Sequence, residues 1–133
     1  MAVFQEDLFY SREHTWVRVD GNIATVGVSD YAQEKLGELY SIELPRTDAE
    51  VEQDEPFGVI ESSKAVAEII SPVSGEIISV NEDIVDDIGV INSDPYGAGW
   101  LVIVELRDLD ELNNLLDAEE YREYVGEEAE IEE

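Results

Sequence analysis

The sequence predicts a mainly β fold with a few short helices, built as a single domain over residues 1–133. Three observations lead to this prediction. A chain of 133 residues that is 44% hydrophobic can bury one packed core. Short apolar segments alternate with turn-forming residues from Tyr10 to Glu105, as is typical of strands. Beyond that stretch, leucines recur at helical spacing.

The first strands form a predicted β-hairpin. Thr15 to Val19 has strand character, and so does Ile23 to Val28. Between them lies Asp20-Gly21-Asn22, a strong turn signal. The two segments are therefore expected to pair antiparallel.

A short helix and a further strand follow the hairpin. Ser29 is a typical N-cap residue for a helix over Asp30 to Leu36, because its hydroxyl can accept from a free backbone N–H. Gly37 is suited to end that helix. Leu39 to Leu44 then has strand character as far as Pro45.

The centre of the chain predicts a hairpin with a lysine near its tip. The apolar runs Phe57 to Ile60 and Val66 to Ile70 flank the short polar stretch Glu61 to Ala65. Two prolines bracket this unit, and each lies eight residues from Lys64. A hairpin folded about its middle therefore places Lys64 at or near the tip.

Later segments return to strand and then change to helix. Val73-Ser74-Gly75 is a turn signal before a strand over Glu76 to Val80. Asn81 to Gly99 is expected to be mostly loop, and Trp100 to Leu106 the last strand.

The C-terminal part is predicted to be helical. Leu109, Leu112, Leu115 and Leu116 have helical spacing, and Asp117 is a candidate cap for a helix through Val125. We expect a folded core over about 8–125. Residues 126–133 are expected to form an acidic, frayed tail.

The formal net charge of −27, from 34 acids and seven bases, narrows the possible partners. Such a surface repels nucleic acid and anionic membranes, and no apolar run is long enough to span a bilayer. The charge is either a solubilising surface, such as one adapted to salt, or a means of steering toward basic partners. Because the acids are spread along the whole chain, the first interpretation is favoured.

Residues Met1 to Asp7 carry acids and no basic cluster, which is unlike a signal or transit peptide. We therefore expect a cytoplasmic protein, with a mature organellar protein as the alternative. Nothing in the sequence demands more than a monomer.

Few side chains are suited to catalysis or metal binding. There is no cysteine, which excludes thiolate chemistry and cysteine metal sites. The single histidine, His14, lies beside Trp16 and is interpreted as a packed structural residue. No metal site is expected, because the acids Glu82-Asp83 and Asp86-Asp87 do not have calcium-loop spacing. Any reactive sulfur would therefore belong to a cofactor.

Only two lysines are present. Lys35 lies near the end of the predicted helix, where a cation complements the helix dipole. Lys64 lies at a bend where Gly, Asn or Asp would be expected. Its position alone is equally consistent with an ordinary exposed loop lysine. A hairpin tip nevertheless projects the ε-amine outward from a rigid base, which suits covalent modification.

Several motifs occur in a family-like order over roughly Leu8 to Tyr124. They are Glu61-Ser62-Ser63-Lys64-Ala65 followed by Ser71-Pro72-Val73-Ser74-Gly75-Glu76, Val90 to Tyr96 running into Gly99-Trp100-Leu101, and Tyr31-Ala32-Gln33 with Leu36-Gly37-Glu38 and Glu43-Leu44-Pro45. Together they resemble the glycine cleavage system H proteins, which are lipoyl carriers. The resemblance implies a lipoyl-domain-like barrel-sandwich hybrid with short helices.

It also implies a cofactor and its supporting residues. Lipoic acid would be joined to Lys64 through an amide. Glu61 matches the motif acid that can help a ligase recognise the hairpin. Gly75 matches the glycine that turns the chain eleven residues beyond the lysine.

The function implied is that of a carrier in glycine catabolism and one-carbon metabolism, not of an enzyme. Its arm would shuttle an aminomethyl intermediate between glycine decarboxylase, aminomethyltransferase and dihydrolipoamide dehydrogenase. A lipoyl ligase or transferase would attach the arm.

Departures from the family pattern at Thr15, Ser63, Val66 and Ala67 motivate an alternative. This is an H-protein-like lipoyl carrier of another pathway, such as sulfur oxidation with a heterodisulfide-reductase-like complex, or a lipoyl relay. A biotinyl carrier is disfavoured, because Ser63 and Ala65 stand where it would have methionines. An unmodified interaction module is a further alternative.

Overall fold

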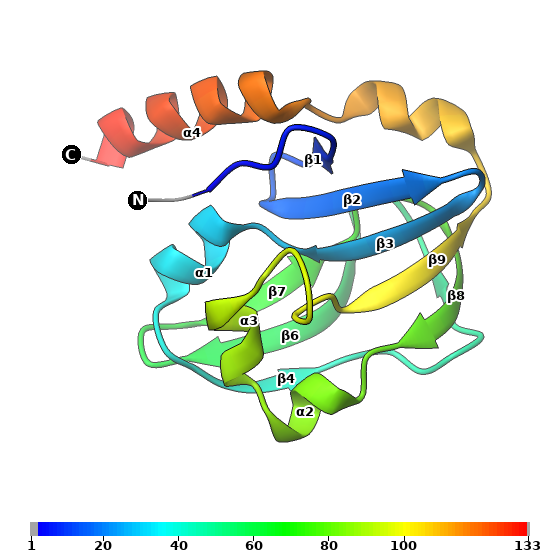
Figure 1. The fold of residues 1–133 in the computed structure, drawn as a ribbon, viewed down its shortest axis with the longest axis horizontal. Helices are drawn as coiled ribbons and strands as arrows, with labels where there is room; N and C mark the ends of the chain where they lie inside the picture. Colours follow the sequence, from blue (N-terminus) through cyan, green and yellow to red (C-terminus); the bar gives the residue numbers. More distant parts are fainter. Residues whose placement is uncertain (1–2, 133) are drawn as a thin grey trace.

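Two antiparallel sheets face each other in the computed structural model, which describes the backbone of residues 3–132 and the side chains of residues 3–126 (Figure 1). The larger sheet has the order β1 (Phe9–Tyr10), β2 (Thr15–Asp20), β3 (Ile23–Val28), β9 (Val102–Leu106), β8 (Gly75–Val80) and β5 (Glu50–Val51). The smaller sheet has the order β4 (Leu39–Glu43), β6 (Pro56–Ser62) and β7 (Val66–Ile70). The predicted mainly β fold with short helices is confirmed.

The N-terminal hairpin and helix form as predicted. Strands β2 and β3 pair antiparallel around the predicted turn, with Asp20 opposite Ile23. Helix α1 spans Asp30–Leu36, and the Ser29 hydroxyl accepts a hydrogen bond from the Ala32 N–H at 3.1 Å. Gly37 ends the helix with a φ of 79°, a backbone conformation that favours glycine.

Apolar side chains from both sheets fill the space between them. Val26, Ile60, Ile77, Leu101 and Val104 are each at most 2% exposed and belong to this main core. Because strand side chains alternate between the two faces, one face of each sheet supplies this core. The opposite face of the larger sheet is also covered at β1 and β2, where Tyr10 and Trp16 are fully buried.

A second, largely aromatic cluster lies under the C-terminal helix α4 (Ala118–Glu132), which crosses above β1 and β2 in Figure 1. Tyr121 of α4 is fully buried and stacks on Tyr10, with ring centroids 4.5 Å apart. Burial raises the pKa of Tyr10 and of Tyr96, so these hydroxyls stay protonated and act as hydrogen-bond donors.

The segment predicted as mostly loop contains two short helices, α2 (Asp83–Asp86) and α3 (Gly89–Ser93). Each is a single turn, too short to show a helical period in the sequence. Both form because they bury one isoleucine each, Ile84 and Ile91, in the main core. The last strand also begins later than predicted, at Val102 instead of Trp100.

Of the four leucines with helical spacing, Leu109 and Leu112 lie in a 3₁₀ helix over Leu109–Asn114. Leu115 and Leu116 lie outside it, before α4, and Leu116 forms a β-bridge with Tyr10 instead. Asp117 and Glu120 cap α4 reciprocally, since each side chain accepts from the other's backbone N–H at 2.8 and 3.0 Å. The helix continues to Glu132, past the predicted end at Val125. The tail predicted over residues 126–133 lies mostly outside the described residues, since their side chains are described only to residue 126. No helix within residues 3–132 has the length and apolar character needed to cross a membrane.

Gly75, one of the motif residues, opens β8 in the larger sheet. It pairs with Val51 of β5 and Leu106 of β9. Its φ is not positive, but a Cβ there would collide with the carbonyl oxygen of Glu105. Close approach of two backbones therefore requires this glycine, and the larger sheet depends on it.

We predict that Gly75→Ala lowers the free energy of unfolding by about 2 kcal/mol or more, because the methyl group has no space and the neighbouring atom is backbone. Gly126→Ala is the matched control, since Gly126 lies in α4 with nothing within 4 Å of an added Cβ. That change should raise stability by about 0.5 to 1 kcal/mol. Urea denaturation measures both, and equal stabilities of the two variants would contradict the account.

Candidate functional site

Lys64 lies at the tip of the β6–β7 hairpin, as predicted. Its two strands pair antiparallel up to Glu61 opposite Val66, which leaves Ser63, Lys64 and Ala65 as the exposed end. The ε-amine therefore projects from a rigid base formed by two paired strands.

The Ser62 side chain stabilises the bend at Lys64, which has none of the Gly, Asn or Asp residues that usually form such turns. This side chain is buried, and its hydroxyl oxygen accepts from the N–H groups of Lys64 and Ala65 at 3.2 Å each. The same hydroxyl lies 3.2 Å from the Ala65 carbonyl, to which it donates, and the Ser62 N–H donates to that carbonyl at 2.9 Å. A serine side chain thus holds the backbone that carries the lysine.

The tip is also attached to the end of helix α1. The Ser63 N–H donates to the Glu38 carbonyl at 2.9 Å. A Cβ on Gly37 would lie only 3.3 Å from Cε of Lys64, so the lysine stem passes over this glycine. Gly37 therefore both ends the helix and leaves room for the lysine.

Glu61 lies on the outer face of the hairpin, three residues before the lysine. Its carboxylate is exposed and accepts from the Ser41 hydroxyl of β4 at 3.2 Å. The structure thus places Glu61 and Lys64 on one hairpin, whereas Gly75 lies in the other sheet. Gly75 supports the fold and does not contact the lysine tip in the described interactions.

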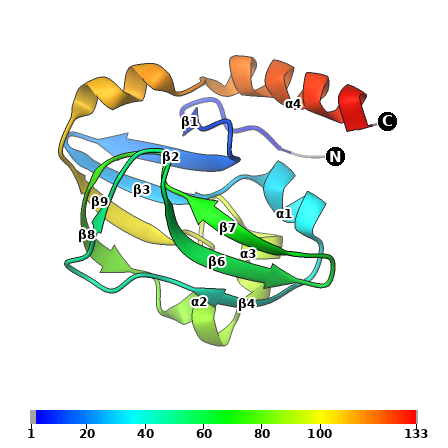
Figure 2. The same ribbon diagram turned by 180° about the vertical axis from the view of Figure 1, so that it is seen from behind.

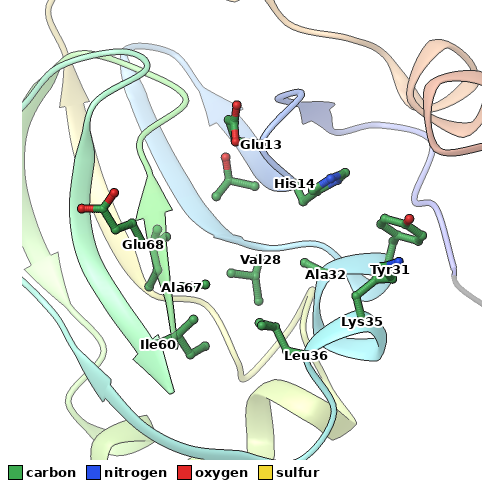
Figure 3. A pocket seen from close by; sticks show the side chains of 12 residues that line it. Glu13, His14, Val28, Tyr31, Ala32, Lys35, Leu36, Ile60, Ala67 and Glu68 are labelled. Atoms are coloured by element: carbon green, nitrogen blue, oxygen red, sulfur yellow. The ribbon is translucent and has the colours of Figure 1, made fainter. Parts of the chain in front are cut away.

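A mainly apolar cavity of about 170 Å³ lies between α1 and the lysine-bearing hairpin (Figure 3). Ala32 and Leu36 of α1 form one wall, and Ile60 and Ala67 of the hairpin form the other. Figure 3 shows the Glu68 carboxylate pointing away from the cavity. Helix α1 and the β6–β7 hairpin therefore form both the cavity and the surroundings of the lysine tip.

His14 and Thr15 also line the cavity, and both are hydrogen-bonded to the surrounding protein. His14 Nδ1 is 2.8 Å from the Tyr121 hydroxyl, and the ring packs against Tyr31 and Tyr124, which confirms the interpretation of a structural histidine. Thr15 is 1% exposed, and its hydroxyl donates to the Ile70 carbonyl at 3.3 Å. Thr15 thus joins β2 to the end of β7.

The sequence assigned no role to Ser62 or to the cavity, and it assigned Gly37 only the end of helix α1, not the space beside the lysine stem. Ser62 stands within the quoted motif, and a serine two residues before a bend is a weak signal for a side-chain turn. The cavity has no local signal, because its walls come from segments far apart in the sequence. Among the described residues, no group of three or more His, Asp or Glu side chains is placed to hold a metal ion.

Comparison with known proteins gives consistent results. Residues 8–128 match the family model for the glycine cleavage H-protein. The chain is 45% identical to the glycine cleavage system H protein of Carboxydothermus hydrogenoformans over 130 residues, which are 98% of this chain and 100% of that protein. It is 44% identical to the H protein of Staphylococcus carnosus over 127 residues, 96% and 100% of the two chains.

A solved structure is similar as well. The crystal structure of a glycine cleavage system H protein from Mycobacterium marinum matches with a TM-score of 0.82 and 37% identity. The match covers 94% of this chain and 98% of that one. The barrel-sandwich fold expected from the sequence motifs is therefore confirmed.

We predict that Ser62→Ala loosens the lysine tip without unfolding the sheet. Removing the hydroxyl leaves two N–H groups without their acceptor, at a cost of about 1 kcal/mol. Amide hydrogen exchange at Lys64 and Ala65 should accelerate about fivefold. Ser63→Ala, at an exposed neighbour, should leave these rates unchanged. Equal rates in the two variants would show that Ser62 does not hold the tip.

Proposed function

The chain belongs to the glycine cleavage H-protein family and is a lipoyl carrier of glycine cleavage, and we propose that Lys64 bears its lipoyl group. The observation that supports this assignment best is the exposed Lys64 at a hairpin tip held by Ser62, inside the region that matches the family. The only other lysine, Lys35, lies in the last turn of α1, over the ring of Tyr31.

The residues around Lys64 fit a lipoyl group. Its aliphatic chain and ring are apolar, and the cavity beside the hairpin is lined mainly by aliphatic side chains such as Leu36, Ile60 and Ala67. The group would supply a disulfide, whose S–S bond would be reduced as one sulfur accepts the aminomethyl group and re-formed by oxidation after that group has left. With no cysteine in the chain, the reactive sulfur must come from this cofactor.

The protein's own residues position the attachment point. Ser62 fixes the backbone on both sides of Lys64, and Gly37 leaves space for the lysine stem at the end of the helix. Acylation removes the ammonium charge of Lys64, which lowers the cost of bringing this side chain to an apolar cavity. We propose that the cavity shelters the loaded arm from water.

The chain would then act as a carrier between enzymes and would not itself be an enzyme. We propose glycine decarboxylase, aminomethyltransferase and dihydrolipoamide dehydrogenase as its partners, with a lipoyl ligase or transferase for attachment. Glu61, exposed three residues before the lysine, is available to that attaching enzyme. We propose that the carrier works as a monomer.

We predict that Lys64→Arg abolishes lipoylation, because arginine keeps the charge but offers no amine for an amide bond. Lys35→Arg should be lipoylated like the unmodified sequence, which makes it the matched control. Intact-mass measurement after incubation with a lipoyl ligase, lipoate and ATP reads out both variants. A lipoyl adduct on the Lys64→Arg protein would refute the assignment.

We also predict that loading brings the arm into the cavity. Lipoylated protein charged with glycine by a glycine decarboxylase should show shifted amide NMR signals at Ala32, Leu36 and Ala67, relative to the uncharged protein. Signals of Val51 and Val104, on strands that do not line the cavity, should not move. Shifts confined to residues 62–65 would argue against a sheltering cavity. Absence of any charging would argue against glycine cleavage itself.

A further inference from the structure

The outer face of the smaller sheet, beside Lys64, is not covered by any described helix (Figure 2). The inner face of the same sheet contributes Ile42, Ile60 and Ile69 to the main core. On the outer face, Tyr40 and Val66 are 59% and 67% exposed, the two highest values among the exposed large apolar side chains of the described residues.

Strand register brings these apolar side chains together with carboxylates. Glu61 of β6 lies opposite Val66 of β7 and opposite Ser41 of β4, and the bulge in β4 adds Tyr40 next to Ser41. This row is the part of the sheet nearest the lysine tip.

The next row away from the tip repeats the pattern. Glu43 of β4 lies opposite Val59 of β6, and Val59 lies opposite Glu68 of β7. Glu43 and Glu68 border a shallow groove of about 380 Å³, whose remaining walls include Leu44, Pro45 and Phe57. The face therefore combines an apolar groove with carboxylates at its edges.

The charge of this face has one sign. The three strands contain the glutamates Glu43, Glu61 and Glu68, all exposed, and no lysine or arginine. Lys64 is the cation of the adjoining tip, and amide formation neutralises it. After lipoylation the tip and the face together are purely anionic. A second copy of this chain would bring like charges together, which disfavours self-association through this face.

We propose that this outer face docks the enzyme that loads the lipoyl arm. Its contact surface would present lysine or arginine side chains around an apolar side chain that enters the groove. The proposal rests on the function proposed above. Loading requires the arm to extend from the tip before the cavity shelters it, and the outer face of the smaller sheet lies beside the tip, within reach of an enzyme that holds the arm. Opposite charges would speed the encounter and orient the tip.

The first test removes charge from the face. Glu43→Gln/Glu68→Gln should raise the KM of a glycine decarboxylase for the lipoylated chain about three- to tenfold at low salt, with kcat unchanged. The increase should shrink as added salt screens the charges. The matched control is Glu76→Gln/Glu105→Gln. It removes two exposed carboxylates whose residues lie opposite each other on neighbouring strands of the larger sheet.

The second test removes the exposed apolar side chains. Tyr40→Ser/Val66→Ser should also raise KM, and this increase should persist in high salt. Ile78→Ser/Val85→Ser is its control, because these two side chains are 42% and 54% exposed and lie outside the smaller sheet. Both pairs are solvent-exposed, so the fold should tolerate either change.

The outcomes separate the two proposals. If the unsubstituted lipoylated chain is loaded and each variant pair changes KM no more than its control, docking on this face is overturned while the carrier function stands. If the unsubstituted chain is lipoylated but never loaded, the proposed loading function fails, and the docking proposal fails with it. KM increases confined to the smaller-sheet pairs would support docking.

Discussion

The junction after helix α1 holds the site together. Gly37 ends the helix with a positive φ, and its carbonyl accepts from the Asn92 side chain at 2.9 Å. Glu38 then accepts from the Ser63 N–H of the lysine-bearing tip. Asn92 also accepts from the Leu39 N–H at 3.2 Å, where β4 begins. Helix α1, strand β4, the hairpin tip and the short helix α3 are therefore joined through the three consecutive residues Gly37, Glu38 and Leu39.

This junction explains why the lysine and the cavity lie side by side. Helix α1 supplies one wall of the cavity, and the hairpin supplies the other. Because the hairpin tip is hydrogen-bonded to the end of α1, the two walls cannot separate without breaking that attachment. A flexible arm on Lys64 thus has a rigid attachment point and an apolar cavity close by, as a carrier that visits several enzymes requires.

The aromatic cluster under α4 stabilises the same region from the other side. The Tyr121 hydroxyl lies 2.8 Å from both His14 Nδ1 and the Ser29 hydroxyl. Ser29 is the N-cap of α1, so the C-terminal helix is connected through one buried hydroxyl to the start of the helix that forms the cavity wall. Both ends of α1 are therefore held by residues distant in sequence.

The sequence by itself determined the elements whose causes are local. Alternation, turn residues and caps predicted the β2–β3 hairpin, helix α1 with Ser29 and Gly37, and Lys64 at a hairpin tip, since each depends on neighbours within a few residues. Only the tertiary structure decided the rest. Helices α2 and α3 form because Ile84 and Ile91 enter a core built elsewhere, and Gly75 is required by the backbone of a strand thirty residues away. The cavity exists only where α1 and the hairpin meet, and a contact between distant segments leaves no local pattern in the sequence.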